Sequence, residues 1–117
     1  MEINKDIQFI VQKKLMQICF GLFMIKLNFE DEIIIEIADS VEYTMKDSKV
    51  QKWIYTTGRK MFSINNLLEI PVKKAVVDIA KNLILDFENG DSIMIKAGKD
   101  GNESYIIYYK KDFQVIY

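Results

Sequence analysis

The sequence predicts a mainly β domain in which two related antiparallel β-meanders form a sandwich or a partly open barrel, with at most one or two short helices. Half of the 117 residues are hydrophobic and only one is proline, as expected of a packed globular core. Several short runs alternate apolar with polar residues, which is the pattern of half-buried strands. One such run, LNFEDEIIIEI, recurs later as LDFENGDSIMIK. We therefore expect one domain, 1–117, with an internal repeat that covers 11–38 and 71–97.

The first segment, residues 5–18, fits either of two elements. Ile7, Ile10 and Leu15 fall on one face of a helix that Asn4 would cap. The related later segment VKKAVVDIA is rich in β-branched residues, which favour strands. The comparison favours a strand over residues 5–18 and leaves the helix open.

Each copy of the repeat then predicts a β-hairpin. In the first copy one strand ends at Phe29, the acidic residues 30–32 form the turn, and the return strand covers Ile33–Ile37. In the second copy the turn contains Asn89-Gly90, two residues that tolerate positive φ and give the strongest short-range hairpin signal. The simplest interpretation is a duplicated three-stranded meander.

The remaining segments predict shorter elements. Residues 50–56 are rich in strand formers, and Ser63 is placed to cap a short helical turn over 64–68. Residues 98–104 have the composition of a loop, and 105–117 predict a final hairpin. If the first strand of that hairpin, Tyr105 to Tyr109, lies at a sheet edge, it offers a surface for pairing with a second copy of the chain. A self-associating structural subunit is therefore one hypothesis.

Missing residue types exclude several classes of chemistry. The chain contains no histidine, which removes Ser-His and Cys-His nucleophile pairs, histidine metal sites and the usual neutral-pH proton carrier. It also contains no glycine-rich loop of the kind that holds phosphates. We therefore expect no catalytic residues, no metal and no cofactor, and a protein that is not an enzyme.

The expected location is the cytoplasm. Cys19 is the single cysteine, and within the apolar run Ile18–Ile25 it is expected to be a small buried hydrophobe in a reducing compartment. That run is eight residues long, whereas a membrane helix needs about 20, so no membrane span is expected. Glu2 and Asp6 oppose a signal peptide.

An acidic stretch is the first candidate binding face. Its predicted partner-binding residues are Glu30, Asp31, Glu32, Glu36, Asp39 and Glu42. Such residues either form an ordinary solvated surface or steer a basic partner protein, because complementary charge raises association rates. A nuclease toxin is a partner of this kind, since carboxylates would occupy the places of its substrate phosphates.

Aromatic residues next to basic ones define an alternative binding face. It comprises Lys52, Trp53, Tyr55 and Arg59. Tryptophan, tyrosine and arginine are enriched in binding hot spots, and aromatics among basic residues can stack on single-stranded nucleic acid. The formal net charge of −1 gives no overall attraction to nucleic acid or to membranes, so neither is the expected partner. A small-ligand module stays open, as does a core position for Trp53.

A composite pattern runs through both halves of the chain. Lys-Lys pairs at 13–14 and 73–74 precede hydrophobic residues, an LxFE(D/N)G-like turn and an IxI strand, and NESYIIYY and a closing IY follow the second copy. This pattern resembles a family of small bacterial proteins of unknown function, in which two related β units each carry an F-x-D-G hairpin and a Glu-x-Trp-type strand ends the chain. The first hairpin departs from it with Asp31-Glu32 in place of Asp-Gly. Domains of similar build include the immunity proteins encoded beside bacterial toxins, so the resemblance implies an immunity-like protein that binds a cognate toxin.

Overall fold

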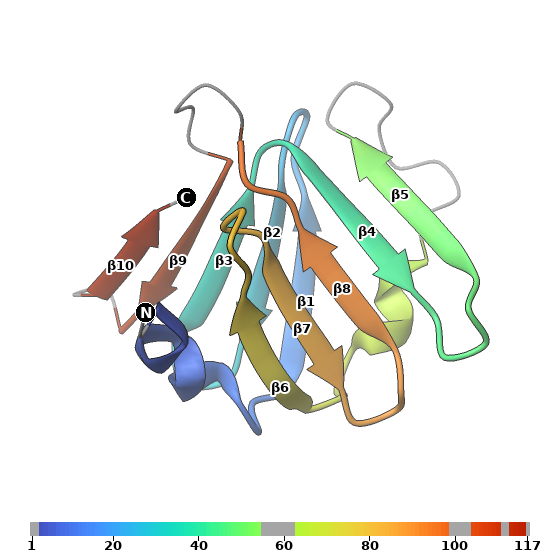
Figure 1. Cartoon of the computed structure of the whole chain (residues 1–117), viewed down its shortest axis with the longest axis horizontal. Coiled ribbons are helices and arrows are strands. Elements are labelled where there is room, and N and C mark those ends of the chain that lie inside the picture. The colour runs from blue at the N-terminus through green and yellow to red at the C-terminus, as the bar shows by residue number, and fades with distance from the viewer. Residues whose placement is uncertain (1–2, 55–62, 99–103, 111–112, 117) are drawn as a thin grey trace.

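The computed structural model describes residues 3–54, 63–98, 104–110 and 113–116. Over these residues the chain forms two antiparallel sheets that pack against each other as a compact β-sandwich (Figure 1). Its radius of gyration, 13.1 Å, is close to the ~13 Å expected of a compact domain of about 100 residues. The predicted mainly β fold class is confirmed.

Each sheet has five strands. The first sheet has the order β1-β2-β3-β9-β10, formed by Leu15–Phe20, Ile25–Phe29, Ile33–Ile37, Tyr105–Tyr109 and Phe113–Ile116. The second sheet has the order β5-β4-β8-β7-β6, formed by Val50–Ile54, Ser40–Thr44, Ser92–Ile95, Leu83–Phe87 and Val72–Val77. Two 3₁₀-helices, η1 (Ile3–Ile10) and η2 (Ile64–Leu67), precede β1 and β6.

The two halves of the chain follow the same path and exchange strands. Strands β1, β2 and β3 form a meander in the first sheet, after which β4 and β5 cross to the second sheet; β6, β7 and β8 form the second meander, after which β9 and β10 cross back. Both first strands also have an irregular register near their start, between Leu15 and Gln17 in β1 and between Val72 and Lys74 in β6. Because of this exchange, each sheet takes strands from both halves.

The core consists of the inward-facing residues of both sheets. Strands β2, β3 and β7 each bury every second side chain, as the alternation predicts. Tyr43 and Trp53, two of the largest buried side chains, lie between the sheets with exposed fractions of 0% and 2%. At one side of the sandwich η1 buries Ile7 and Ile10, and the Phe9 ring stacks on Tyr109 at 4.3 Å. Full burial of one such apolar side chain contributes about 1.5–3 kcal/mol.

The strand predicted over residues 5–18 is wrong in its first part. Residues up to Ile10 form η1, and β1 begins only at Leu15. Ile7 and Ile10 are three residues apart, so one 3₁₀ turn places both against the core. Gln12, with φ of 74°, then redirects the chain into the strand. The helix that was left open for residues 5–18 is present as η1, but it ends at Ile10.

Other elements depart from the sequence predictions in position. Strand β4 follows β3 after only two residues. It was not predicted because it lies within the acidic stretch, which was interpreted as a surface. Strand β9 lies between β3 and β10 and is therefore not the sheet edge that self-pairing required. Cys19, expected to be buried, is exposed because it points to the outer side of β1. Lys13 and Lys14 precede β1 whereas Lys73 and Lys74 lie within β6, so the two Lys-Lys pairs are not at equivalent positions.

Candidate functional site

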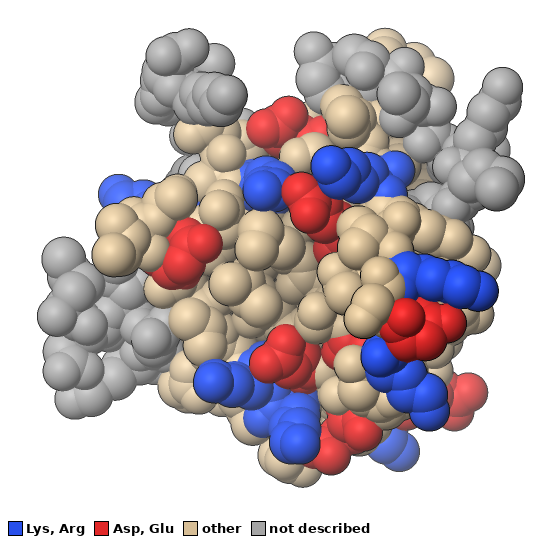
Figure 2. All heavy atoms as spheres, turned by 45° about the vertical axis from the view of Figure 1, so that its right-hand side comes forward, with Lys and Arg blue, Asp and Glu red and all other residues tan. Residues whose placement is uncertain are grey.

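The six acidic residues predicted to form one binding face are divided between two sheets. Glu36 lies on the outer side of β3 in the first sheet, whereas Glu42 lies on the outer side of β4 in the second, where its Oε2 is 3.3 Å from Lys96 Nζ. Asp39 lies in the connection between these strands. In Figure 2, red and blue side chains lie next to each other rather than in separate areas. The predicted single acidic face is therefore wrong as a unit, because the chain changes sheets in the middle of it.

Two of the six residues hold the local structure together. Glu30 Oε1 accepts a hydrogen bond from the backbone N–H of Lys14 at 2.8 Å, and Asp31 Oδ2 is 2.7 Å from Lys13 Nζ. The hydrogen bond between these side chains lowers the pKa of Asp31 and raises the pKa of Lys13. Both contacts tie the β2–β3 turn to the segment before β1.

Two more of the six, Glu32 and Glu36, lie on a surface that also contains apolar side chains. Strand β3 buries Ile33, Ile35 and Ile37, so the residues between them face outward. The register places Ile34 opposite Tyr108 and Glu36 opposite Ile106 of β9, whose side chains are also partly exposed. We call the set Glu32, Ile34, Glu36, Ile106 and Tyr108 the β3–β9 face.

Charges on the β3–β9 face are only partly paired. Glu36 Oε2 is 3.6 Å from Lys26 Nζ on β2, and Tyr108 donates a hydrogen bond from its hydroxyl to Glu36 Oε1 at 3.3 Å. Glu32 is exposed and makes no ion pair with any residue in the described part of the chain. Among the described residues Glu36 is thus paired and Glu32 is not, with apolar side chains beside them.

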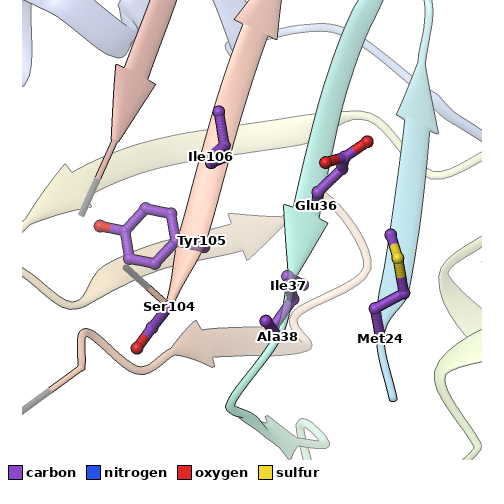
Figure 3. A pocket seen from close by; sticks show the side chains of 7 residues that line it. All are labelled: Met24, Glu36, Ile37, Ala38, Ser104, Tyr105 and Ile106. Carbon is purple, nitrogen blue, oxygen red and sulfur yellow. The ribbon is translucent and has the colours of Figure 1, made fainter. Parts of the chain in front are cut away.

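Two hollows lie along this face and share Glu36. The larger, about 300 Å³, is lined by Glu32, Ile34, Glu36 and Tyr108. The smaller, about 140 Å³, is shown in Figure 3 with its lining residues on and beside β2, β3 and β9: Met24, Glu36, Ile37, Ala38, Ser104, Tyr105 and Ile106. Next to Met24, the β1–β2 connection exposes 83% of Leu22 and 61% of Phe23. Apolar surface thus continues from the hollows to the exposed connection.

The β2–β3 turn that carries Glu32 has two consecutive residues with positive φ. Asp31 and Glu32 have φ of 64° and 59°, the left-handed region that glycine adopts most easily. In the equivalent turn between β7 and β8, Gly90 takes the positive φ of 93°. Placing side chains in this conformation costs roughly 1–2 kcal/mol per residue. The β2–β3 turn therefore has a conformational free-energy cost at Asp31 and Glu32 that Gly90 avoids in the β7–β8 turn.

The alternative binding face is not formed as predicted. Trp53 points between the sheets and is 2% exposed, so its ring is part of the core and has no surface on which a ligand could stack. Lys52 points outward on β5 opposite Glu42. Tyr55 and Arg59 lie outside the residues that the structure describes.

A buried hydrogen-bond network joins the two halves on the inner side of the second sheet. Tyr43 donates a hydrogen bond from its hydroxyl to Asp91 Oδ2 at 2.6 Å, and Asp91 Oδ1 accepts one from the Lys46 backbone N–H at 2.9 Å. Asn89 Nδ2 donates to Asp91 Oδ2 at 3.1 Å. Burial, and then the hydrogen bond to Asp91, raise the pKa of Tyr43 to about 12. Asp91 is 8% exposed with both oxygens bonded, which identifies it as a structural carboxylate.

A third hollow, about 450 Å³, lies beside this network on the second sheet. It is lined by Lys73, Lys74, Asp86, Phe87, Gly90, Asp91 and Ser92. Lys74 and Asp86 are cross-strand partners, so opposite charges face the same space. The hollow therefore favours neither a cation nor an anion.

Within the described residues, no three histidine, cysteine, aspartate or glutamate side chains are close enough to share a metal ion. No helix in the same residues has the length and hydropathy needed to cross a membrane.

The apolar part of the β3–β9 face was missed at the sequence level, although a signal was present. Three consecutive isoleucines, Ile33–Ile35, cannot all face inward in a strand, so one of them must face outward. The same holds for Ile106 and Tyr108 in the run YIIYY. That these outward residues are neighbours follows only from the pairing of β3 with β9.

No family model, curated protein or solved structure matches this chain. The interpretation of the site therefore rests on its own residues.

Proposed function

We propose that this chain is a non-enzymatic protein-binding domain, an immunity protein that neutralises a cognate bacterial toxin in the cytoplasm by binding it through the β3–β9 face. The observation that carries the proposal is the combination of outward apolar residues with a carboxylate in the same hollow, that of Glu32, which pairs with no residue that the structure describes. Interface centres are enriched in aromatic and apolar side chains, and their rims are polar. The β3–β9 face has this composition.

The chemistry of the partner follows from the charges. Glu32 and Glu36 line the same hollow, and within the described residues only Glu36 is paired, with Lys26. A basic partner surface would complete the pairing, and complementary charge of this kind raises the association rate and excludes wrong partners. A toxin that acts on nucleic acid has a basic cleft for phosphates, in which two carboxylates and an apolar strip would block access.

The backbone of the β2–β3 turn supports the same assignment. Asp31 and Glu32 keep side chains in a conformation that glycine would adopt at lower cost. Other turns of the chain, at Ser48, Lys81 and Lys110, also have positive φ, so this conformation supports the assignment only because Glu32 also lines the hollow. Exposed Leu22 and Phe23 beside Met24 add apolar surface that a partner could cover.

The test is capture of the partner from the cells that make the protein, followed by a neutralisation assay. The tagged chain is purified from these cells, the co-purifying proteins are identified by mass spectrometry, and each is expressed alone and together with the chain. The proposal predicts a stoichiometric partner whose expression stops growth and whose effect the chain reverses. The absence of any stoichiometric partner, or a partner whose effect the chain leaves unchanged, would contradict it.

The matched variants are two double charge reversals. Glu32→Lys with Glu36→Lys alters the β3–β9 face. Glu42→Lys with Glu88→Lys makes the same change of charge on the second sheet. Glu42 is paired with a lysine at 30% side-chain exposure, close to the 31% of Glu36, and Glu88 is exposed like Glu32. Only the first pair should lose the partner.

A further inference from the structure

We infer that the larger hollow of the β3–β9 face receives a single arginine side chain of the partner. The inference rests on the proposed function and specifies which chemical group the face recognises. Its basis is the shape of the hollow, its lining and the carboxylate of Glu32, which pairs with no described residue.

The size of the hollow limits its occupant. Its volume is about 300 Å³, at the lower end of the roughly 300–1,000 Å³ of small-molecule sites. Ile34 and the Tyr108 ring, which are cross-strand partners, provide its apolar part. Glu32 lines it from the β2–β3 turn and Glu36 from near the end of β3, so the two carboxylates reach the hollow from different positions along the chain. The hollow suits one long side chain with an apolar stem.

The charges favour a cationic side chain, although Lys110, whose backbone N–H donates to the Glu32 carbonyl oxygen at 3.1 Å, adds one positive charge nearby. Glu36 has Lys26 at 3.6 Å and the Tyr108 hydroxyl at 3.3 Å. Glu32 has no such partner among the described residues and also lines the hollow. An acidic or neutral occupant would leave the Glu32 carboxylate uncompensated where the partner excludes water. A cation would compensate it.

The lining favours a guanidinium over an ammonium group. A guanidinium is planar and can stack on the Tyr108 ring while donating two parallel hydrogen bonds to a carboxylate. It is also more weakly hydrated than an ammonium, so it loses less on entering a hollow floored by Ile34. The methylene stem of arginine would cover the same apolar floor.

The experiment uses three probes that differ only at the end of the side chain. N-acetyl-arginine amide, its lysine analogue and its neutral citrulline analogue are titrated into the whole protein, and amide chemical shifts are followed by NMR. Saturable shifts confined to Glu32, Ile34, Glu36 and Tyr108 are expected for the arginine probe. The lysine probe should bind more weakly and the citrulline probe should produce no saturable shift.

Variants then test each part of the hollow. Glu32→Gln and Tyr108→Leu should each weaken binding of the arginine probe roughly two- to fivefold, the range expected of one exposed ion pair or cation–π contact. Glu88→Gln, in the equivalent turn of the second half, should have no effect. Because Glu32 and Glu88 are exposed turn residues, neither substitution should impair folding.

The outcomes separate this inference from the proposed function. Equal binding of the arginine and citrulline probes, or no saturable shift with arginine, overturns the inference. If in that case the Glu32→Lys, Glu36→Lys variant still fails to capture the partner, the face binds a basic protein but not through an arginine in this hollow. If the arginine probe binds but the same variant captures the partner normally, both the proposed binding face and the inferred occupant are wrong.

Discussion

Replacing Tyr43 by phenylalanine tests whether the buried Tyr43–Asp91 hydrogen bond holds the two halves together. The hydroxyl of Tyr43 is on β4 of the first half, and Asp91 is in the β7–β8 turn of the second. The substitution removes a 2.6 Å hydrogen bond to a carboxylate that is 8% exposed. Hydrogen bonds to charged groups contribute about 1.5–3 kcal/mol, and Asp91 keeps its contacts with Lys46 and Asn89. We expect a loss of about 2 kcal/mol in unfolding free energy.

Urea unfolding followed by tryptophan fluorescence measures this loss. Trp53 is the single tryptophan and is buried, so its emission reports the opening of the core. A loss of about 2 kcal/mol corresponds to a fall of roughly 1 M in the urea midpoint. Tyr108→Phe is the matched control, because its hydroxyl bond is longer, 3.3 Å, and only partly buried. If Tyr43→Phe costs no more than Tyr108→Phe, the buried pair does not contribute as argued.

Three further predictions address titration, register and strain. Since the pKa of Tyr43 is raised from 10.0 to about 12, the folded state favours the neutral hydroxyl. The difference in unfolding free energy between the wild type and Tyr43→Phe should therefore be constant below pH 10 and fall by roughly 2 kcal/mol towards pH 12. A difference that does not change with pH would contradict this. Ile35→Ala should cost about 2–5 kcal/mol and Ile34→Ala less than about 1 kcal/mol in urea unfolding, because only Ile35 faces the core; equal losses would refute the register. Glu32→Gly should raise the unfolding free energy by up to about 1 kcal/mol while slowing partner association. A lower unfolding free energy would show that the positive φ of Glu32 does not destabilise the fold.

Local pattern was enough to predict most strands. The alternation in β2 and β7 and the Asn89-Gly90 turn depend on residues close together in the sequence, so the hairpins were placed correctly. Strand β4 was missed because Val41 and Tyr43 alternate with Glu42 inside an acidic stretch that was interpreted as surface. The burial of Trp53 could not be decided either, since its chain neighbours Lys52 and Ile54 are both exposed and its own burial depends on how the two sheets pack.

The candidate site could be predicted only in part because it depends on pairing between distant strands. Glu32 and Glu36 were identified from their charge, the first in the turn and the second on the outward side of the strand that follows. Tyr108 joins them only through the pairing of β3 with β9, which is far along the chain. Glu42 is not part of the β3–β9 face because β4 belongs to the other sheet. No short-range signal specifies such a change of sheet.

The most direct test of the binding face is the association rate of the captured partner with the wild type and the two double charge reversals at low salt. We expect Glu32→Lys with Glu36→Lys to slow association by roughly tenfold or more. Glu42→Lys with Glu88→Lys should change the rate by less than about twofold. The circular dichroism spectra of both variants should match that of the wild type, which shows that they are folded. Equal rates for the two variants would show that the partner does not recognise the β3–β9 face.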